Sequence, residues 1–243
     1  MKFGITVSQI NEVDLVVQAE NAGYDFCWVW DSPMIRSNLW ALLALVAERT
    51  SRISIGPGVA IPALSMAPVT ANAIATINAI APGRTFLGVG TGNTALRAMG
   101  QVPMTIQALE AQLKVIRGLL AGETVAYEAN GINEDIAFQS LELGCINLDD
   151  PIPIHISGFG PKAQALAGEY GDGLITGIPR GGTIPNALAN VKVGADRAGR
   201  ALAKFETYAL VNLMLLRPGE TLQSARVFDE VGSSIMVNIH SVY

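Results

Sequence analysis

Two glycine-rich stretches contain the residue types that can bind a ligand. In the first, residues 84–97 (RTFLGVGTGNTALR), a short apolar run leads into glycines followed by Asn93 and Thr94. Glycine has no Cβ, so the backbone here can bend sharply and approach a ligand closely. Asn93 and Thr94 can cap a helix or donate hydrogen bonds to a phosphate or ring oxygen. The stretch predicts either a binding loop at the carboxyl end of a buried strand or a tight turn that joins a strand to a helix.

The second stretch is residues 157–162 (SGFGPK), which follows an apolar run and precedes a helical pattern. Pro161 suits the first turn of a helix, where its missing N–H costs nothing. Backbone N–H groups at the positive end of a helix can hold a phosphate, and Lys162 can add a positive charge. The alternative is an ordinary turn at the start of a helix, and the residues leave both interpretations open.

Two isolated residues are weaker candidates for acid–base chemistry. Asp31 follows an aromatic strand-like run and is either a general base or a helix-capping, structural carboxylate. Strand alternation places His155 on one face with Ser157, and Ile154 and Ile156 on the other. A hydrogen-bonded core histidine is the favoured interpretation of His155, with a catalytic role as the alternative.

Composition excludes several classes of function. Half of the 243 residues are hydrophobic, only 15% are charged, and the net charge is -5 without a basic cluster. Nucleic acid is therefore not an expected partner, because phosphate backbones require clustered Lys and Arg. No apolar run reaches the roughly 18 residues of a membrane span, and no signal peptide is evident, so we expect a cytoplasmic protein. Two cysteines and two histidines do not have the spacing of a metal site, so no metal is expected.

Strand and helix patterns alternate along the chain. Near-continuous apolar runs predict strands covered on both faces, and the connections have the length of parallel βαβ units. Strands are expected at residues 2–7, 26–30, 53–61, 86–89, 152–157, 173–176 and 204–216, and helices at 12–21, 38–49, 68–80, 104–120, 161–170 and 186–199. We therefore predict an α/β protein whose ligand lies at the carboxyl ends of its strands.

The predicted architecture is a (β/α)8 TIM-type barrel that forms a single domain over residues 1–243. A barrel of this type has eight strands, and only seven are clear in the sequence, which leaves open whether the barrel is complete at its C-terminal end. Residues 123–150 break the rhythm and predict a loop or short hairpin on one rim. The tail fits either a helix or a strand, and its four-residue spacing favours a helix over 231–243.

Four segments together resemble the luciferase-like flavin-dependent oxidoreductases, the superfamily of bacterial luciferase and the coenzyme F420-dependent reductases. They are AENAGYDFCWVWDS (19–32), ALLALVAERTSRISIGPGVAIP (41–62), APGRTFLGVGTGNTALRAMG (81–100) and IPIHISGFGPKAQALAGEYGDGLITG (152–177). The resemblance covers most of the first 180 residues, and none of its motifs is specific to one substrate.

The resemblance implies a (β/α)8 barrel that binds FMN or F420 at the carboxyl ends of its strands. A bulge at the end of the third strand would back the ring of the cofactor, the glycine loop after the fourth strand would line it, and the loop after the fifth would hold its phosphate. The residues implied are Val59, Ala60, Gly90, Gly92, Asn93, Thr94, Ser157, Gly158, Phe159, Gly160, Lys162, Thr176 and Gly177.

The expected function is that of an oxidoreductase that transfers a hydride to, or oxygenates, a small organic substrate. The resemblance also implies a homodimer. Two alternatives remain open at this stage. One is a shortened flavin-binding protein without turnover, and the other is a phosphosugar enzyme on the same barrel, for which only Asp31 is available as a strand-end carboxylate.

Overall fold

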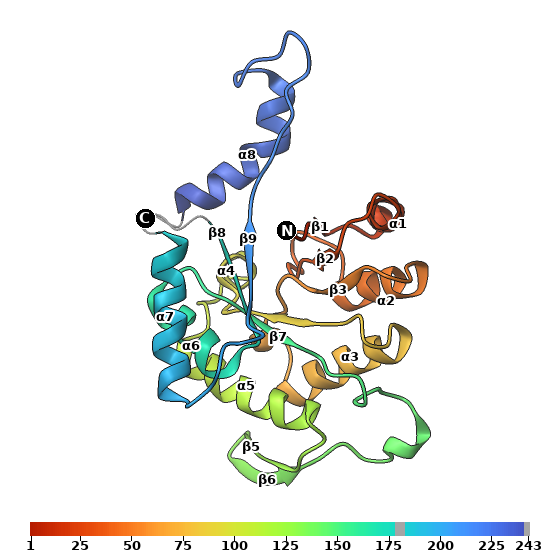
Figure 1. Ribbon diagram of the computed structural model, residues 1–243, viewed down its shortest axis with the longest axis vertical. Coiled ribbons are helices and arrows are strands. Elements are labelled where there is room, and N and C mark those ends of the chain that lie inside the picture. Colours follow the sequence, from red (N-terminus) through yellow and green to blue (C-terminus); the bar gives the residue numbers. More distant parts are fainter. Residues whose placement is uncertain (178–182, 241–243) are drawn as a thin grey trace. The chain divides into compact units, whose positions relative to one another are not determined.

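Strands and helices alternate through the N-terminal half of the protein (Figure 1). The computed structural model describes residues 1–177 and 183–240. The elements of this half are β1 Gly4–Val7, α1 Val13–Asn21, β2 Phe26–Val29, α2 Leu39–Arg49, β3 Ser54–Pro57, α3 Ala67–Ile80 and β4 Leu87–Val89, with short 3-10 turns at Ile10–Glu12 and Pro62–Leu64. These bounds agree closely with the predicted elements, except that the third strand ends at Pro57.

The second half resumes the alternation after a hairpin. Its elements are α4 Asn93–Ala98, α5 Ile106–Leu120, β5 Val125–Ala129, β6 Ile132–Ile136, a 3-10 turn Leu141–Leu143, β7 Ile154–Ser157, α6 Pro161–Tyr170, β8 Gly173–Gly177, α7 Ile184–Arg197, β9 Glu206–Leu210 and α8 Ala225–His240. The antiparallel hairpin of β5 and β6 lies inside the segment that was expected to break the rhythm.

The inner strands form two sheets, in the orders β1-β2-β3 and β4-β7-β8-β9. The pairs β1–β2, β2–β3, β4–β7 and β7–β8 are parallel, and parallel bridges from Ile55 to Thr85 and from Ala60 to Val89 join β3 to β4. Seven strands thus follow one another around part of a barrel, as predicted. The α/β barrel architecture is confirmed. The chain falls into two compact units, Met1–Tyr208 and Ala209–Tyr243, and a single domain over residues 1–243 stays a prediction.

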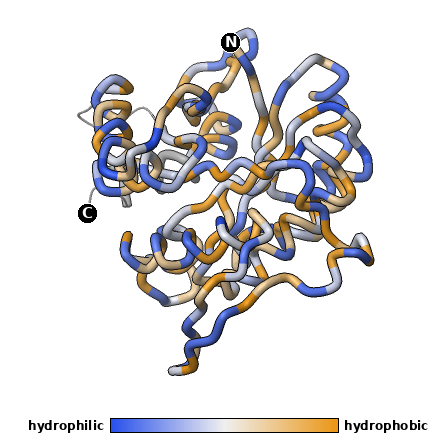
Figure 2. Tube along the Cα trace, turned by 60° about the horizontal axis from the view of Figure 1, so that its bottom comes forward, coloured by the Kyte–Doolittle hydropathy of each residue, from blue (hydrophilic) through white to orange (hydrophobic). Residues whose placement is uncertain are grey.

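The helices of the first unit pack through one apolar face each. In α2 the buried side chains are Leu39, Leu42, Leu43, Val46 and Ala47, which recur every three or four residues. Asn38 begins this helix by accepting a hydrogen bond from Ala41 N at 3.1 Å. Figure 2 shows the same alternation of hydrophobic and hydrophilic residues along the helices. This covering positions the strands whose carboxyl ends form the site.

Aromatic rings fill the interior of the barrel. Phe26 and Trp28 of β2 stack at 5.3 Å between ring centroids, and the Phe86 ring lies 5.6 Å from Trp28 and 4.9 Å from His155. Tyr208 of β9 contacts both Trp28 and His155, at 5.3 and 4.8 Å. The rings come from β2, β7 and β9 and from the residue just before β4, so their contacts connect the two sheets.

Glycines on the inner strand faces make room for these rings. A Cβ added to Gly4 would lie 2.2 Å from the Trp28 ring, and one added to Gly56 would lie 2.2 Å from the Phe86 carbonyl oxygen. A Cβ on Gly173 would come within 2.9 Å of the His155 ring. These glycines are therefore required for close packing across the barrel rather than for a turn.

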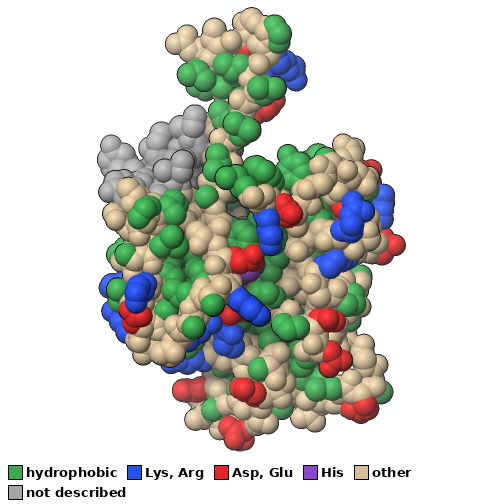
Figure 3. All heavy atoms as spheres, in the orientation of Figure 1, with side chains coloured by type: hydrophobic (Ala, Val, Ile, Leu, Met, Phe, Trp, Pro, Cys, Tyr) green, Lys and Arg blue, Asp and Glu red, His purple; other side chains and the backbone are tan. Residues whose placement is uncertain are grey.

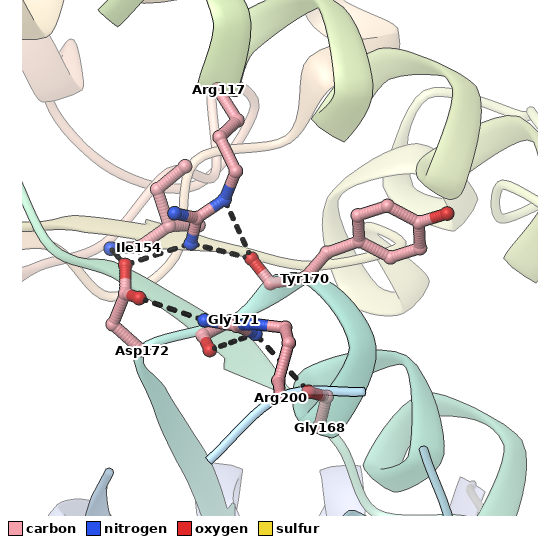
Figure 4. A network of polar contacts seen from close by, with 7 residues as sticks. All are labelled: Arg117, Ile154, Gly168, Tyr170, Gly171, Asp172 and Arg200. Carbon is pink, nitrogen blue, oxygen red and sulfur yellow. Dashed lines mark hydrogen bonds and ion pairs between the residues drawn. The ribbon is translucent and has the colours of Figure 1, made fainter. Parts of the chain in front are cut away.

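A polar network closes the opposite end of the barrel from the strand carboxyl termini (Figure 4). Asp172 accepts hydrogen bonds from Arg117 Nη2 at 2.8 Å, from Arg200 Nη2 at 3.2 Å and from Ile154 N at 3.0 Å. Arg117 also donates to the Tyr170 carbonyl, and Arg200 to the Gly168 and Gly171 carbonyls. One carboxylate thus connects α5, the end of α6, and the starts of β7 and β8.

Two predictions of secondary structure are wrong. The predicted strand over 204–216 ends at Leu210, because the apolar residues that follow it, such as Leu213 at 93% exposure, have no strand beside them. The short helix α4 was not predicted, since six residues are too few to show a helical period. The tail was correctly predicted as a helix, although that helix begins earlier, at Ala225, and residues 241–243 lie outside the described part.

Candidate active site at the carboxyl ends of the strands

The chain beyond β3 is held between its two neighbouring strands. The Gly58–Val59 peptide bond is cis, just after the third strand, where the resemblance implied a bulge. Gly58 N donates to the Val29 carbonyl of β2 at 2.7 Å. Ala60 N donates to the Gly88 carbonyl of β4 at 2.8 Å, and Gly90 N donates to the Ala60 carbonyl at 3.1 Å. The backbone at Val59 and Ala60 therefore has a fixed position at the barrel rim.

Asp31 is a second support for this segment. It follows β2, and its Oδ2 accepts a hydrogen bond from Ile61 N at 3.1 Å. Burial raises the pKa of Asp31, and the hydrogen bond from Ile61 partly offsets that effect. Of the two roles that the sequence left open, the observed contact supports the structural one: Asp31 holds backbone at the mouth of the barrel.

The glycine loop after β4 meets Val59 and Ser157. A Cβ added to Gly90 would lie 2.8 Å from Val59 Cγ2 and 3.3 Å from Ser157 Cβ. These three residues come from the ends of three successive strands, so the loops after the fourth and fifth predicted strands lie at the same mouth. The absence of a side chain at Gly90 lets the ends of these three strands pack closely together at the rim.

Gly92, Asn93 and Thr94 lie just beyond this meeting point. Gly92 has φ of +75°, a left-handed conformation that favours glycine, and α4 begins directly after it. Asn93 Oδ1 accepts a hydrogen bond from Arg97 Nε, one helical turn further along, at 2.9 Å. Thr94 is exposed to solvent.

The loop after β7 leads into α6 as predicted. Gly158 N donates to the Ile175 carbonyl at 2.9 Å, and Pro161 occupies the first turn of the ten-residue helix. Gln164 N bonds back to the Gly160 carbonyl at 3.0 Å, which leaves the N–H groups before it directed out of the helix end. Phe159 and Lys162 are exposed beside this end. The geometry suits an anion such as a phosphate.

Thr176 and Gly177 complete the row on β8. Thr176 is fully buried, and a Cβ on Gly177 would lie 3.0 Å from the Phe159 ring. Gly177 is therefore next to the loop that leads into α6. Arg180, which follows this strand, lies outside the described residues.

His155 lies inside the barrel rather than at its mouth. It is 1% exposed, and burial lowers its pKa from 6.5 to about 4, an effect that Glu206 and Asp172 partly oppose. Within the described residues neither ring nitrogen has a hydrogen-bond partner. His155 is thus a core histidine as favoured, but it lacks the hydrogen bonds that this interpretation assumed.

The structure brings most of the predicted binding residues to one rim. Val59, Ala60, Gly90 and Ser157 meet directly, and Gly158, Phe159 and Gly177 form the adjoining part beside α6. Sequence reasoning missed the contact of Asp31 with Ile61, because a bond between residues thirty positions apart leaves no signal in local spacing.

Comparison with known proteins agrees with this arrangement. The model of the luciferase-like monooxygenase family matches residues 7–226. A 5,10-methylenetetrahydromethanopterin reductase of Archaeoglobus fulgidus is 30% identical over 93% of this chain and 68% of its own length. An F420-dependent glucose-6-phosphate dehydrogenase of Nakamurella multipartita is 31% identical over 80% of this chain and 60% of its own length.

A solved structure shows the same fold. An F420-dependent secondary alcohol dehydrogenase in complex with an F420–acetone adduct superposes with a TM-score of 0.75 and 25% sequence identity, over 86% of this chain and 68% of that chain. This chain therefore spans 60% to 68% of the length of these three proteins. The match of the family model across most of the chain shows that the protein belongs to the luciferase-like monooxygenase family.

Proposed function

We propose that the protein is an oxidoreductase that binds coenzyme F420 at the carboxyl ends of its strands. The observation that carries this proposal is the meeting of Val59, Gly90 and Ser157 beside the start of α6. Two relatives named for dependence on F420 support F420 over FMN. This chain spans 60% to 68% of the length of three similar proteins, so the activity of the whole protein is part of this proposal.

The residues of the mouth fit a phosphorylated tricyclic cofactor. Gly90 adds no side chain to the rim where Val59 and Ser157 pack against it, and the backbone of Val59 and Ala60, held by hydrogen bonds to β4, can support a ring face. The N–H groups at the start of α6 and the exposed Lys162 suit the phosphate. Both features lie on adjacent strands, so one molecule can occupy them together.

The protein contributes position and exclusion of water. When bound, F420 supplies the hydride chemistry, which needs no acid–base pair from the protein in its redox step. Asp31 keeps the Ile61 segment in place, and the packed aromatic rings of the barrel interior lie close to one another. This division of work is consistent with the structural role of Asp31, whose carboxylate accepts a hydrogen bond from Ile61 N.

The direct test is titration of the purified protein with F420, followed by the absorbance and fluorescence of its deazaflavin ring. We expect a saturable change that corresponds to one cofactor per chain, and weaker binding of FMN. A change with FMN alone would transfer the assignment to the flavin-dependent branch. No change with either cofactor would contradict the proposal. Binding without any substrate oxidation or reduction would instead favour the shortened, non-catalytic flavin-binding protein.

We also propose that the protein forms a homodimer through its outer helices. Leu15 of α1, Leu45 of α2 and Val69 of α3 are 49%, 44% and 48% exposed, and these helices pack in succession. Charged residues of both signs are interspersed on the face shown in Figure 3. We expect sedimentation velocity to give the mass of a dimer, and a monomer at high concentration would contradict this.

A cytoplasmic location stays a prediction.

A further inference from the structure

A second hollow lies on the same rim as the proposed cofactor site. The loops that follow β1 and β2 border a shallow, widely open surface hollow of about 510 Å³. It is lined by Gln9, Ile10, Asn11, Ile35, Arg36 and Ser37. Because β1 and β2 are parallel neighbours, their following loops share the mouth at which Asp31 lies.

The walls of this hollow are fixed by hydrogen bonds between the two loops. Ser37 N donates to the Ser8 carbonyl at 3.1 Å, and Ile10 N donates to Ser37 Oγ at 3.0 Å. The Glu12 carboxylate accepts from Ser8 N and Gln9 N, at 2.6 and 2.8 Å, so its charge is engaged in holding the first loop. These hydrogen bonds hold the two loops in a defined arrangement around the hollow.

Arg36 is the charged group of the hollow. Its guanidinium lies over the Trp30 ring, 5.7 Å from the centroid, and its backbone N donates to the Ser32 carbonyl at 2.8 Å. The Nε atom is buried without a hydrogen-bond partner, and among the described residues the guanidinium has no ion pair. Because Nε is closed to solvent, the donors that a ligand can reach are the terminal Nη groups, for which the described residues supply no acceptor.

The chemistry of these residues selects an anion. A guanidinium presents paired N–H donors that match the two oxygens of a carboxylate or phosphate, and its stacking on Trp30 holds that fork in place. Gln9 and Asn11 can donate further hydrogen bonds. Ile10 and Ile35, which are 48% and 49% exposed, offer apolar contact to the body of the molecule.

We propose that this hollow binds the oxyanion of the substrate, so that the protein acts on an organic carboxylate or phosphate ester whose anionic group pairs with Arg36. This inference rests on the proposed oxidoreductase function, since it places the substrate beside the cofactor on one rim. Arg36 is then a residue that determines substrate specificity rather than one that takes part in hydride transfer.

The test uses the whole chain labelled with 15N-arginine and three probes of similar size: benzoate, phenyl phosphate and the uncharged benzamide. We expect benzoate or phenyl phosphate to shift the Arg36 Nε–H resonance saturably, and benzamide at the same concentration to leave it unchanged. The stronger of the two anions identifies the kind of oxyanion. No saturable shift with either anion, or an equal shift with benzamide, would overturn the proposal.

Two substitutions sharpen the result by calorimetry. We expect Arg36→Leu to weaken anion binding at least tenfold and Arg36→Lys to restore only part of it, because lysine retains the charge but not the fork. Arg49→Leu is the matched control, since Arg49 is exposed and paired with Asp14 at 3.0 Å. Unchanged binding by Arg36→Leu would count against the site. Failure of the wild-type protein to bind F420 would overturn the proposed function while leaving the anion result standing.

Discussion

Replacement of Gly90 by leucine is expected to weaken F420 binding by about 100-fold or more. A Cβ at this position would lie 2.8 Å from Val59 Cγ2 and 3.3 Å from Ser157 Cβ, so a leucine must displace the segment proposed to back the ring and the end of β7. Displacement of both walls removes their contacts with the ring, and we expect a loss in binding free energy of about 3 kcal/mol, or about 100-fold in affinity. Fluorescence titration with F420 measures the change.

The matched control is Gly232→Leu in α8. A Cβ at Gly232 meets nothing within 4 Å, so this substitution adds the same side chain without filling the mouth. The circular dichroism spectrum of Gly90→Leu should match that of the wild-type protein, which separates a blocked site from a lost fold. Wild-type affinity in a folded Gly90→Leu protein would show that the cofactor does not lie over this glycine.

Acid should destabilise the protein through His155. Burial lowers the pKa of this histidine from 6.5 to about 4, so the folded state favours the neutral ring. The stabilisation is complete above pH 6.5, is lost as the pH falls from 6.5 to 4, and changes no further below 4. The free energy of unfolding should fall by about 3 kcal/mol across this window on account of His155. Urea denaturation at a series of pH values measures this fall.

His155→Phe is the informative variant for this prediction. Phenylalanine keeps a flat ring between Phe86 and Tyr208 but cannot take up a proton, so the variant should lose much less stability between pH 6.5 and 4. Glu142→Gln, which changes an exposed carboxylate, should keep the wild-type pH dependence. An identical pH dependence in His155→Phe and the wild-type protein would mean that this histidine is not held neutral by the core.

The order of elements could be predicted because each depends on local pattern. Strands buried on both faces appear as apolar runs, and helices such as α2 and α6 begin at a clear signal, Asn38 or Pro161. The rule that ligands lie at the carboxyl ends of parallel strands then selected one mouth of the barrel for the site, which stays a prediction. That mouth is where Gly90 and Ser157 meet in the structure.

The features that escaped prediction depend on contacts across the fold. Residues 211–216 are as apolar as a strand, yet no neighbouring strand pairs with them, so β9 ends at Leu210. The interior rings come from segments as far apart as Phe26 and Tyr208, and no local spacing relates them. Arg36 was overlooked because a single arginine in a loop is unremarkable until its stacking on Trp30 and its buried Nε are seen.

The account depends on one ligand being held by two rims, the glycine loop after β4 and the loop that leads into α6. Titration of 15N-labelled protein with F420 tests this directly through the amide resonances of Gly90 and Gly160. The account predicts that both resonances shift along the same saturation curve, with one dissociation constant. Movement of only one rim, or of the two at clearly different concentrations, would contradict it.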